Sequence, residues 1–425
     1  MAGSGRGVDV AVVGAGMAGL RAARDLAEGG RSVVVLEARD RVGGRGFTVD
    51  LNGRMVELGG SWFTPDQHEV MAELRRYGLP TRDFPPIRHT RWRTDGELRF
   101  GLPVPWHELG ALEHALLQIA LDAEAVGPGE TETASMSASA YIASLDPPPA
   151  VRDFLTGWWQ LMGGAPPDKG AVIDALGAIA NHGGLAGLVT CLAHGPQAGW
   201  SALAEALAAT PGVEVRLDQT VERISTDDDG VTVSTVAGAT IHAAAIIVAV
   251  PVNVLPKIAF EPPLPARVAD AAGMNAEAAV KVLMLVRGVA PHGIAVGVGE
   301  GLHWWYVDDD VDGLVRVTGF GWADPAFDPS DRQHIDRALA AFFPEATLEA
   351  FRSHDWIADP ASRGTWLTAP AGALDLLDPS RFRAVGRMFF AGSDVAEEEA
   401  GWFEGALRSG SAAAREVRDL LSAGG

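Results

Sequence analysis

The sequence predicts an α/β fold in which two domains are interleaved along the chain. Residues 8–37 read as an apolar strand, a glycine-rich turn, an amphipathic helix and a second apolar strand, which together make a βαβ unit. Strands that are apolar on both faces suit a buried parallel sheet. Short apolar runs between residues 213 and 250, and again between 278 and 321, predict further strands. We therefore expect a Rossmann-like sheet and a separate α+β domain.

Each element in turn is predicted by its own pattern. The first helix, residues 17–28, follows the glycine turn directly, and the second strand ends at residue 36. From about residue 69 to 207, apolar residues recur every three or four positions, which predicts a largely helical insertion. A short strand from residue 388 and a long Ala-rich helix to residue 421 come last. Apolar runs bounded by turn residues predict the remaining strands, at 213–217, 220–226, 231–236, 244–250, 278–287, 294–298, 302–307 and 315–321.

Two acidic runs are interpreted as turns. The first, residues 227–229, precedes a glycine between two predicted strands. The second, residues 308–312, separates another pair of strands, and its acids adjoin one another without the interspersed ligands of a calcium loop. Neither run is expected to bind a metal.

The composition excludes several classes of protein. Among 425 residues, 55 Asp and Glu outnumber 34 Lys and Arg, and the resulting charge of −21 would repel nucleic acid and anionic membranes. The single cysteine, Cys191, excludes an internal disulfide and a Cys-rich metal site. The longest apolar run, residues 243–252, is too short to span a bilayer, which takes about 20 residues. We expect a cytoplasmic protein without a signal peptide or a membrane anchor.

The glycine-rich turn between the first strand and the first helix predicts dinucleotide binding. Gly14, Gly16 and Gly19 have the GxGxxG spacing, which permits a tight turn and close approach of a pyrophosphate to the helix N-terminus. Glu37, which closes the next strand 18 residues after Gly19, is placed to bond the adenosine ribose hydroxyls. This pattern leaves both NAD and FAD open, and a glycine turn that serves only helix packing is the alternative.

The residues after the second strand favour one cofactor. Residues 37–45 (EARDRVGGR) resemble the ExRxRxGGR extension typical of flavoproteins of the amine oxidase and desaturase superfamily, which favours FAD. The resemblance implies that Arg39, Gly44 and Arg45 lie near the cofactor, with Arg45 as a cation beside the pyrophosphate. Residues 57–62 (ELGGSW) are similar to the family segment beside the isoalloxazine ring, which implies contacts from Gly59, Gly60, Ser61 and Trp62.

The C-terminal part carries a specific match. Residues 387–394 and 401–410 resemble the family's flavin motif FAGxE…GxxEGAxxSG, with Asp394 in place of the commoner Glu. The first amides of the last helix are expected at the flavin edge where negative charge gathers on reduction, and Asp394 at the ribityl chain. The contacts implied by this motif, and by a strand whose backbone would face adenine, are Gly392, Ser393, Asp394, Trp402, Phe403, Ala406 and Val221.

Within this superfamily the chain looks most like the flavin monoamine oxidases. Lys281 matches the family lysine that holds a water against flavin N5, and it lies in an apolar strand, where burial would lower its pKa. Trp366 and Trp402 match the two aromatic positions that flank the amine. A lysine at a sheet edge and two core tryptophans are the alternatives. Thr365 stands where some members carry a flavin-linked cysteine, so FAD is expected to be non-covalent.

The substrate cavity is expected beside the helical insertion. Leu161 and Met162 match a cavity-lining stretch of the family. L-amino-acid oxidases of the superfamily generally place an arginine soon after the double glycine to bind the substrate carboxylate, whereas residues 61–64 are SWFT here, so a simple amine is favoured. Four residues in neighbouring segments, each of which could equally be a helix-packing residue, are Trp158, Trp159, Val189 and Gln197.

These resemblances imply a FAD-dependent amine oxidase, with a GR2-type FAD-binding domain interleaved with an α+β substrate-binding domain. Hydride transfer to flavin N5 would give an imine, hydrolysed to an aldehyde or ketone, and O₂ would reoxidise the flavin to give hydrogen peroxide. An L-amino-acid oxidase or desaturase, and a GDI-like lipid-binding protein, are the alternatives. The expected partners are a small-molecule amine and O₂, and formation of a homodimer is left open. The expected segments are 1–75, 201–260 and 376–425 for FAD, and 76–200 and 261–375 for the substrate.

Overall fold

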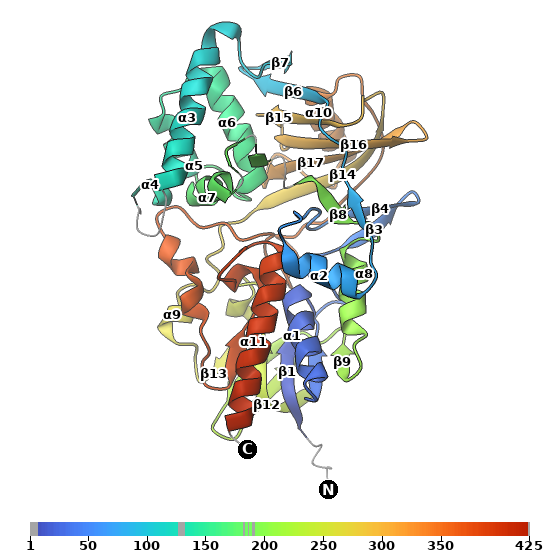
Figure 1. Ribbon diagram of the computed structural model, residues 1–425, viewed down its shortest axis with the longest axis vertical. Coiled ribbons are helices and arrows are strands. Elements are labelled where there is room, and N and C mark those ends of the chain that lie inside the picture. Colours follow the sequence, from blue (N-terminus) through green and yellow to red (C-terminus); the bar gives the residue numbers. More distant parts are fainter. Residues whose placement is uncertain (1–6, 126–131, 182, 186, 189–191, 424–425) are drawn as a thin grey trace.

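The computed structural model describes residues 7–125, 132–181, 183–185, 187–188 and 192–423. Its elements form two regions, each built around one large sheet, that are stacked along the long axis of the molecule (Figure 1). Segments from the two ends of the sequence, drawn in blue and red, lie side by side in the lower region. The predicted α/β fold with two interleaved domains is confirmed.

The lower sheet contains the predicted βαβ unit. Strand β1 (Val8–Val13) pairs in parallel with β2 (Val33–Leu36) and with β12 (Thr240–Val248). Helices α1 (Met17–Glu28) and α11 (Phe403–Ala423) pack against each other over one face. Side chains on both faces of these strands are buried, as their continuous apolar sequence requires. The other strands of this sheet are β9 (Val213–Arg216), β10 (Val221–Thr226), β11 (Val231–Thr235), β13 (Ala259–Glu261) and β19 (Met388–Phe390).

This sheet draws on three distant parts of the chain. Across it the strands run in the order β13, β10, β11, β12, β1, β2 and β9, and β19 pairs in parallel with β12. The parts that contribute are residues 8–36, 213–261 and 388–390. They fall within the three segments expected for FAD except that β13 runs one residue past position 260, and the boundaries of those segments stay predictions.

The upper sheet is mainly antiparallel. Its one parallel contact among the described strands joins its fifth and sixth members. In order across the sheet, the strands are β18 (Thr347–Ser353), β14 (Ala279–Arg287), β17 (Leu314–Trp322), β16 (Trp304–Val311), β15 (Gly293–Gly297), β6 (His89–Thr94) and β7 (Glu97–Phe100).

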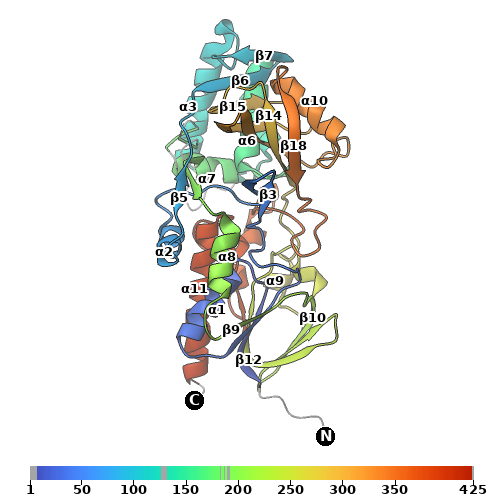
Figure 2. The same cartoon turned by 90° about the vertical axis from the view of Figure 1, so that its right-hand side faces the viewer.

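Helices cover both faces of the upper sheet. Successive residues of a strand point to opposite faces, so Trp304 packs with α6 (Pro149–Met162) and Trp305 with α10 (Arg332–Phe342). Figure 2 shows α10 beside β18 at the outside of this region. Both tryptophans are fully buried, which anchors the sheet between two cores.

The helical insertion and the connecting segments contain the remaining elements. No helix in the described part of the chain is long and apolar enough to cross a membrane. The elements are β3 (Thr48–Leu51), β4 (Arg54–Glu57), α2 (His68–Arg76), β5 (Thr81–Asp83), α3 (Leu109–Ala125), α4 (Glu132–Ser135), α5 (Ala138–Ser144), α7 (Ile173–Asn181), β8 (His194–Pro196), α8 (Trp200–Ala208) and α9 (Ala266–Ala269).

Two parts of the secondary structure differ from the prediction. Strands β5, β6, β7 and β8 lie inside the segment expected to be helical, and β3, β4, β13 and β18 were not expected at all. In β6 only Trp92 and Thr94 are buried, and they alternate with arginines. Such short, polar strands near a sheet edge carry few apolar residues, so the helical spacing around them dominates the sequence pattern.

The second acidic run is only partly a turn. β16 continues through it, and the turn consists of Asp312 and Gly313, which both have positive φ angles. Asp308 is 2% exposed and accepts hydrogen bonds from Arg82 and Arg316. A buried carboxylate needs such partners. The prediction of a turn was therefore wrong for Asp308, whereas the first run does connect β10 and β11.

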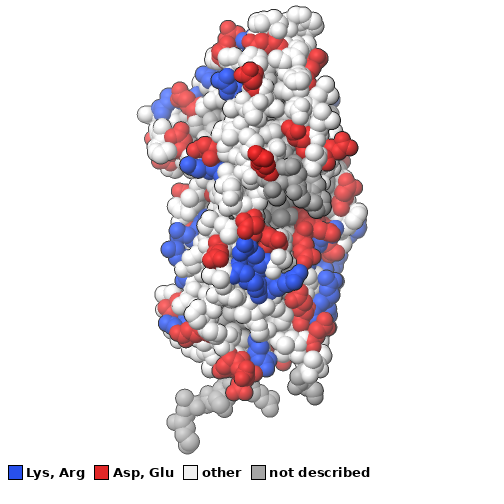
Figure 3. Space-filling model, turned by 90° about the vertical axis from the view of Figure 1, so that its left-hand side faces the viewer, with Lys and Arg blue, Asp and Glu red and all other residues white. Residues whose placement is uncertain are grey.

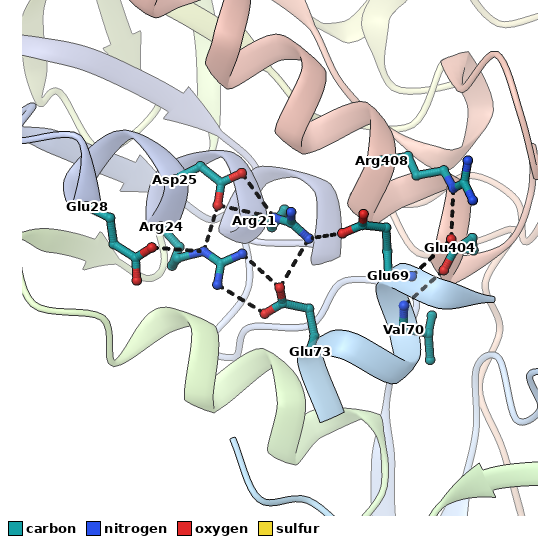
Figure 4. A network of polar contacts seen from close by, with 9 residues as sticks. All are labelled: Arg21, Arg24, Asp25, Glu28, Glu69, Val70, Glu73, Glu404 and Arg408. Carbon is teal, nitrogen blue, oxygen red and sulfur yellow. Dashed lines mark hydrogen bonds and ion pairs between the residues drawn. The ribbon is translucent and has the colours of Figure 1, made fainter. Parts of the chain in front are cut away.

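A network of buried charges joins α1, α2 and α11 (Figure 4). The Arg24 side chain, 2% exposed, lies 2.8 Å from the Glu73 carboxylate. Glu404, which is fully buried, accepts hydrogen bonds from the backbone amides of Glu69 and Val70 and from Arg408. It thereby caps the N-terminus of α2, whose own N-cap residue makes no side-chain cap bond. The network therefore fixes α1, which begins at the glycine turn, and α11, which begins within the flavin motif.

The surface shows no segregation of charge on the face drawn in Figure 3. Lys and Arg side chains are interspersed there with Asp and Glu. A nucleic-acid site typically presents a basic stripe. That face has no such stripe among its described residues, which is in keeping with the net charge of −21.

Candidate active site

A cavity of about 450 Å³ lies between the two regions. At its lower side are the carboxyl ends of β1 and β2, where parallel α/β sheets bind their ligands. Its volume falls in the ordinary range for small-molecule sites. The lining comes from segments distant in the sequence, namely residues 13–18, 36–39, 43–45, 58–62, 160–162, 219–222, 249–251, 365–367 and 400–403, together with Lys281.

The glycine turn forms a cradle on the lower side of this cavity. Gly14 has a φ angle of +101°, and a Cβ there would lie 2.8 Å from the carbonyl oxygen of Ala249. A Cβ on Gly19 would collide with the carbonyl oxygen of Gly14. On Gly16 it would meet no atom within 4 Å, because this glycine borders the open cavity. Two glycines therefore serve the turn and one leaves space, as a pyrophosphate beside the N-terminus of α1 requires.

Glu37 lies where a ribose-binding acid is expected. The carboxylate is 3% exposed and borders the cavity. It accepts hydrogen bonds from the backbone amides of Ala15, at 2.7 Å, and of Arg39, at 3.0 Å. The Arg39 guanidinium also borders the cavity and is held by Asp359 at 2.9 Å. Val221 also lines the cavity, and its expected place near adenine stays a prediction.

Arg45 and Asp394 form an ion pair at one wall of the cavity. The guanidinium lies 2.7 Å from the Asp394 carboxylate and also donates to Ser393 Oγ and to the carbonyl oxygen of Thr365. The other Asp394 oxygen accepts from the amide of Val252. Arg45 and Ser393 line the cavity, whereas Asp394 lies behind them. In this placement Asp394 bonds to Arg45, and its expected contact with a ribityl chain stays a prediction.

Lys281 is buried on β14, the second strand of the upper sheet. β14 pairs with β17 on one side and β18 on the other, so the alternative of a lysine at a sheet edge is wrong. The Nζ atom donates to the carbonyl oxygen of Gly59 and to Ser61 Oγ, both at 2.6 Å. Burial lowers the pKa of Lys281 to about 7, against the opposing charge of Glu57. The lysine and the double-glycine segment thus meet at the cavity wall.

Glu57 is a buried acid that the sequence pattern did not single out. One of its oxygens accepts from Thr48 Oγ1 at 2.8 Å and from the amide of Trp200 at 2.9 Å. The other has no partner in the described structure. Burial raises the pKa of Glu57, while its hydrogen bonds and Lys281 act in the opposite direction. The only signal in the sequence was its position as the first residue of the ELGGSW motif.

Trp366 and Trp402 reach the cavity from two separate segments. Both line it and both are partly buried. The indole N–H of Trp366 donates to the carbonyl oxygen of Met162 at 3.2 Å. Gly401, with a φ angle of +81°, brings the second segment against the first, since a Cβ on it would lie 3.6 Å from the Cβ of Trp366. The two tryptophans therefore line the cavity and also pack against the core of the upper region.

Gly60 and Phe403 come from two different segments of the cavity wall and lie next to each other. A Cβ on Gly60 would lie 2.5 Å from the Phe403 ring, which itself packs on Trp200 with ring centroids 3.9 Å apart. Phe403 begins α11, and its helix-opening amides border the cavity near the double glycine. The remaining predicted cofactor residues that line the cavity are Gly44, Gly59, Ser61, Trp62, Gly392 and Ala406.

Comparison with known proteins identifies the family. The profile of the flavin-containing amine oxidoreductases matches residues 17–418. The chain belongs to this family. It is 32% identical to (S)-6-hydroxynicotine oxidase of Paenarthrobacter nicotinovorans, a match that covers 96% of this chain and 99% of that protein. It is 28% identical to pseudooxynicotine dehydrogenase of a Pseudomonas species, over 97% of this chain and 86% of that one. Cyclohexylamine oxidase from Brevibacterium oxydans shares the fold, with a TM-score of 0.85 at 22% identity and coverage of 98% and 100%.

The cofactor of this amine oxidase is FAD, and the residues present fit it. The cradle at Gly16, the acid at Glu37 and the cavity beside the double glycine supply its expected places. Thr365, at the position of the flavin-linked cysteine, offers no thiol. Its hydroxyl donates to the buried carboxyl of Glu277, and burial raises the pKa of that acid to about 8. FAD is therefore held without a covalent bond.

The helical side of the cavity matches the prediction in part. Leu161 and Met162 line it. Trp158 and Trp159 are buried in the core instead, because their side of α6 faces the upper sheet. The indole N–H of Trp159 donates to the carbonyl oxygen of Ala165. Gln197 is exposed in the turn after β8 and is not among the described lining residues. Val189 lies outside the described residues.

Two polar residues on the helical side were not predicted. Gln160 on α6 is fully buried, lines the cavity, and has no hydrogen-bond partner for either amide atom in the described structure. Asp174 on α7 also lines the cavity and accepts from the backbone amide of Ala369 at 2.9 Å. Burial raises the pKa of Asp174 to about 7, although that amide acts in the opposite direction. In the sequence, the only signal for Gln160 and Asp174 is that each is a polar residue in an otherwise apolar helical pattern.

Proposed function

We propose that this amine oxidase binds a neutral amine between Trp366 and Trp402, with Lys281 on the opposite side of the reacting carbon. The observation that carries this proposal is that these three side chains, from distant segments, line one cavity with the glycine cradle. FAD supplies the acceptor for a hydride from the amine α-carbon, and its reoxidation by O₂ gives hydrogen peroxide. The imine product is hydrolysed by water to an aldehyde or ketone.

The protein contributes position and electrostatics. The indole faces orient an amine nitrogen and its α-carbon and exclude water from them. Lys281 uses two of its three N–H groups on Gly59 and Ser61, so the third is available to hold a water at the cavity. A lysine with a pKa of about 7 can also give up and regain a proton near neutral pH.

The charges of the cavity favour an amine over an amino acid. A substrate carboxylate would need a cation, yet Arg39 is held by Asp359 and Arg45 by Asp394. No arginine follows the double glycine, where residues 61–64 are SWFT. The relatives compared above are named for alkaloid and cyclic amines, which supports amines of this size as first substrates.

A screen of amines and amino acids tests this function. The FAD-loaded protein would be mixed with primary, secondary and cyclic amines and with L-amino acids, and hydrogen peroxide would be followed with a peroxidase-coupled dye. We expect peroxide from amines only, and catalase should abolish the signal. Because one relative is named a dehydrogenase, flavin bleaching under argon would be recorded as well. Turnover of L-amino acids without any amine would contradict the proposal.

Two further expectations stay proposals. The single cysteine supports a reducing, cytoplasmic location. A homodimer is supported by exposed apolar side chains on and before α3, among them Trp106 at 77% and Leu117 at 67%. Light scattering of the purified protein would measure the mass in solution, and a mass of one chain would contradict the dimer.

A further inference from the structure

The helical wall of the cavity holds a polar pair with no assigned role. Gln160 is 0% exposed, and both its amide oxygen and its amide nitrogen lack partners in the described structure. Leaving such a group unpaired destabilises the folded protein. Asp174 is enclosed by protein but keeps accessible surface, and it borders the same cavity. Unpaired polar groups at the edge of a cavity can be completed by a bound ligand or by water.

The structure ties this pair to the tryptophan slot. The segment 366–369 carries Trp366 at one end, and its other end donates the Ala369 amide to Asp174. Trp366 itself bonds to Met162, at the end of the helix that carries Gln160. Three residues of chain span at most ~10 Å, so Asp174 lies within reach of a substrate that starts in the slot.

The carboxylate of Asp174 has no cation to balance it. Among the described residues it forms no ion pair, and no charged side chain contributes to its altered pKa. The other buried acids near the cavity differ, since Asp394 pairs with Arg45 and Glu57 lies near Lys281. A positive group on a bound molecule is the partner that a buried carboxylate lacks.

We infer that Asp174 and Gln160 form a second subsite, which binds the protonated distal nitrogen of a diamine while its other nitrogen lies between Trp366 and Trp402. The inference rests on the proposed function and names its substrate class. The distal ammonium would donate to the free Asp174 oxygen and to the Gln160 carbonyl oxygen. No covalent step occurs at this subsite, and the reacting amine is oxidised as before.

A structural role alone would account for only part of this arrangement. The bond from Ala369 uses one Asp174 oxygen and pins α7 to the segment 366–369. It explains neither the second oxygen nor the two unpaired atoms of Gln160. Asp174→Asn separates the two roles, because Asn can still accept from Ala369 while it loses the charge.

The test compares diamines with matched monoamines. For chains of four to eight carbons, kcat/KM would be measured for the α,ω-diamine, the n-alkylamine and the amino alcohol of equal length. We expect the wild type to favour the diamine over the monoamine by at least tenfold at one length. Asp174→Asn and Gln160→Met should each reduce that ratio at least fivefold. Asp168→Asn, on an exposed residue outside the described lining, is the matched control and should leave it unchanged.

Each other outcome has a defined meaning. A ratio near one in the wild type, or an unchanged ratio in Asp174→Asn, would overturn the subsite. Equal kcat/KM for the amino alcohol and the diamine would overturn the role of charge. If no amine is oxidised, the proposed function fails, and the melting temperature with 1,4-diaminobutane then tests the subsite alone. A rise with the diamine but not with butylamine, absent in Asp174→Asn, would support it, and equal shifts would overturn it.

Discussion

Lys281 is a residue whose surroundings set its chemistry. It is 7% exposed, donates two hydrogen bonds at 2.6 Å, and has the rings of Trp62 and Phe320 within 5.7 Å and 5.5 Å of its Nζ atom. Such aromatic faces attract the charged form, whereas burial favours the neutral one. The net effect brings its pKa down to about 7. This residue can therefore change its charge near neutral pH.

Replacement of this lysine tests its part in the reaction with oxygen. Lys281→Met keeps the length of the side chain but removes its donors, so the water at the cavity loses its holder. We expect the variant to retain FAD and to react with O₂ at least tenfold more slowly, about 1.4 kcal/mol by rate arithmetic. Stopped-flow mixing of the reduced enzyme with oxygenated buffer measures this rate. A change below twofold would show that the lysine is structural.

Glu57 should control where Lys281 titrates. Its negative charge raises the lysine pKa, in opposition to burial. Glu57→Gln removes the charge at constant shape, so the pKa of Lys281 should fall below about 7. The limb of the pH profile of flavin reoxidation that follows Lys281 should therefore move to lower pH. An unmoved limb, or one at higher pH, would contradict the coupling between the two residues.

The two cavity tryptophans should act on flavin reduction. Trp366→Ala and Trp402→Ala remove faces that orient the amine, and each is expected to slow anaerobic reduction by roughly tenfold or more, about 1.4 kcal/mol. Because both act on one bound group, the double variant should lose less than the sum of the two effects. Stopped-flow reduction under argon measures the rates, and flavin absorbance checks FAD binding. Variants that unfold or lose FAD would instead identify core residues, whose truncation costs ~3–5 kcal/mol of stability.

The positions of residues at the cavity were predictable where a motif carried them. Lys281, Trp366 and the glycines of the cradle lie where the sequence placed them, because each belongs to a motif with fixed spacing. Gln160 and Asp174 belong to no such motif, and a single polar residue in an apolar helix gives no direction. Trp158 and Trp159 were misplaced because neighbouring positions on a helix differ by about 100° in direction, and the sequence alone does not say which position faces the cavity.

At the scale of elements, regular patterns predicted the strands and helices with long apolar stretches. β1, β2, β14 and α1 match their expected bounds to within a residue. Of the strands that escaped prediction, β6, β7 and β18 lie near the edges of the upper sheet and are only partly buried. Their stability comes from pairing with neighbours distant in the sequence, which a local pattern does not contain.

Glu404 should be critical for the packing of α2 on α11. Glu404→Ala would leave the amides of Glu69 and Val70 without an acceptor in a buried place. We expect a loss of roughly 3 kcal/mol in the free energy of unfolding, measured with urea, and a smaller loss for Glu404→Gln. Glu416→Ala, on the exposed side of the same helix, is the control and should change it by less than about 0.5 kcal/mol. Equal effects at both positions would contradict the capping role.

At the scale of the whole molecule, the cofactor cavity lies between the two regions and is lined by both. FAD should be bound by this enclosure alone, because Thr365 offers no thiol. Acid precipitation of the purified protein should release all the flavin into the supernatant, measured by its absorbance. Yellow colour that remains in the washed pellet would contradict non-covalent binding. Since FAD binds only the folded chain, its removal should also lower the melting temperature.

The three-part lower sheet has a consequence for the synthesis of the protein. The βαβ unit leaves the ribosome before α11, which packs on α1 and begins only at Phe403. Bacterial and eukaryotic ribosomes add ~5–20 residues per second, so roughly 20–70 seconds separate Leu36 from Phe403. During that interval the apolar side of α1 stays uncovered and the flavin end of the site does not exist. A complete flavin site therefore requires α11, so we expect FAD to be captured only after this helix has been synthesised.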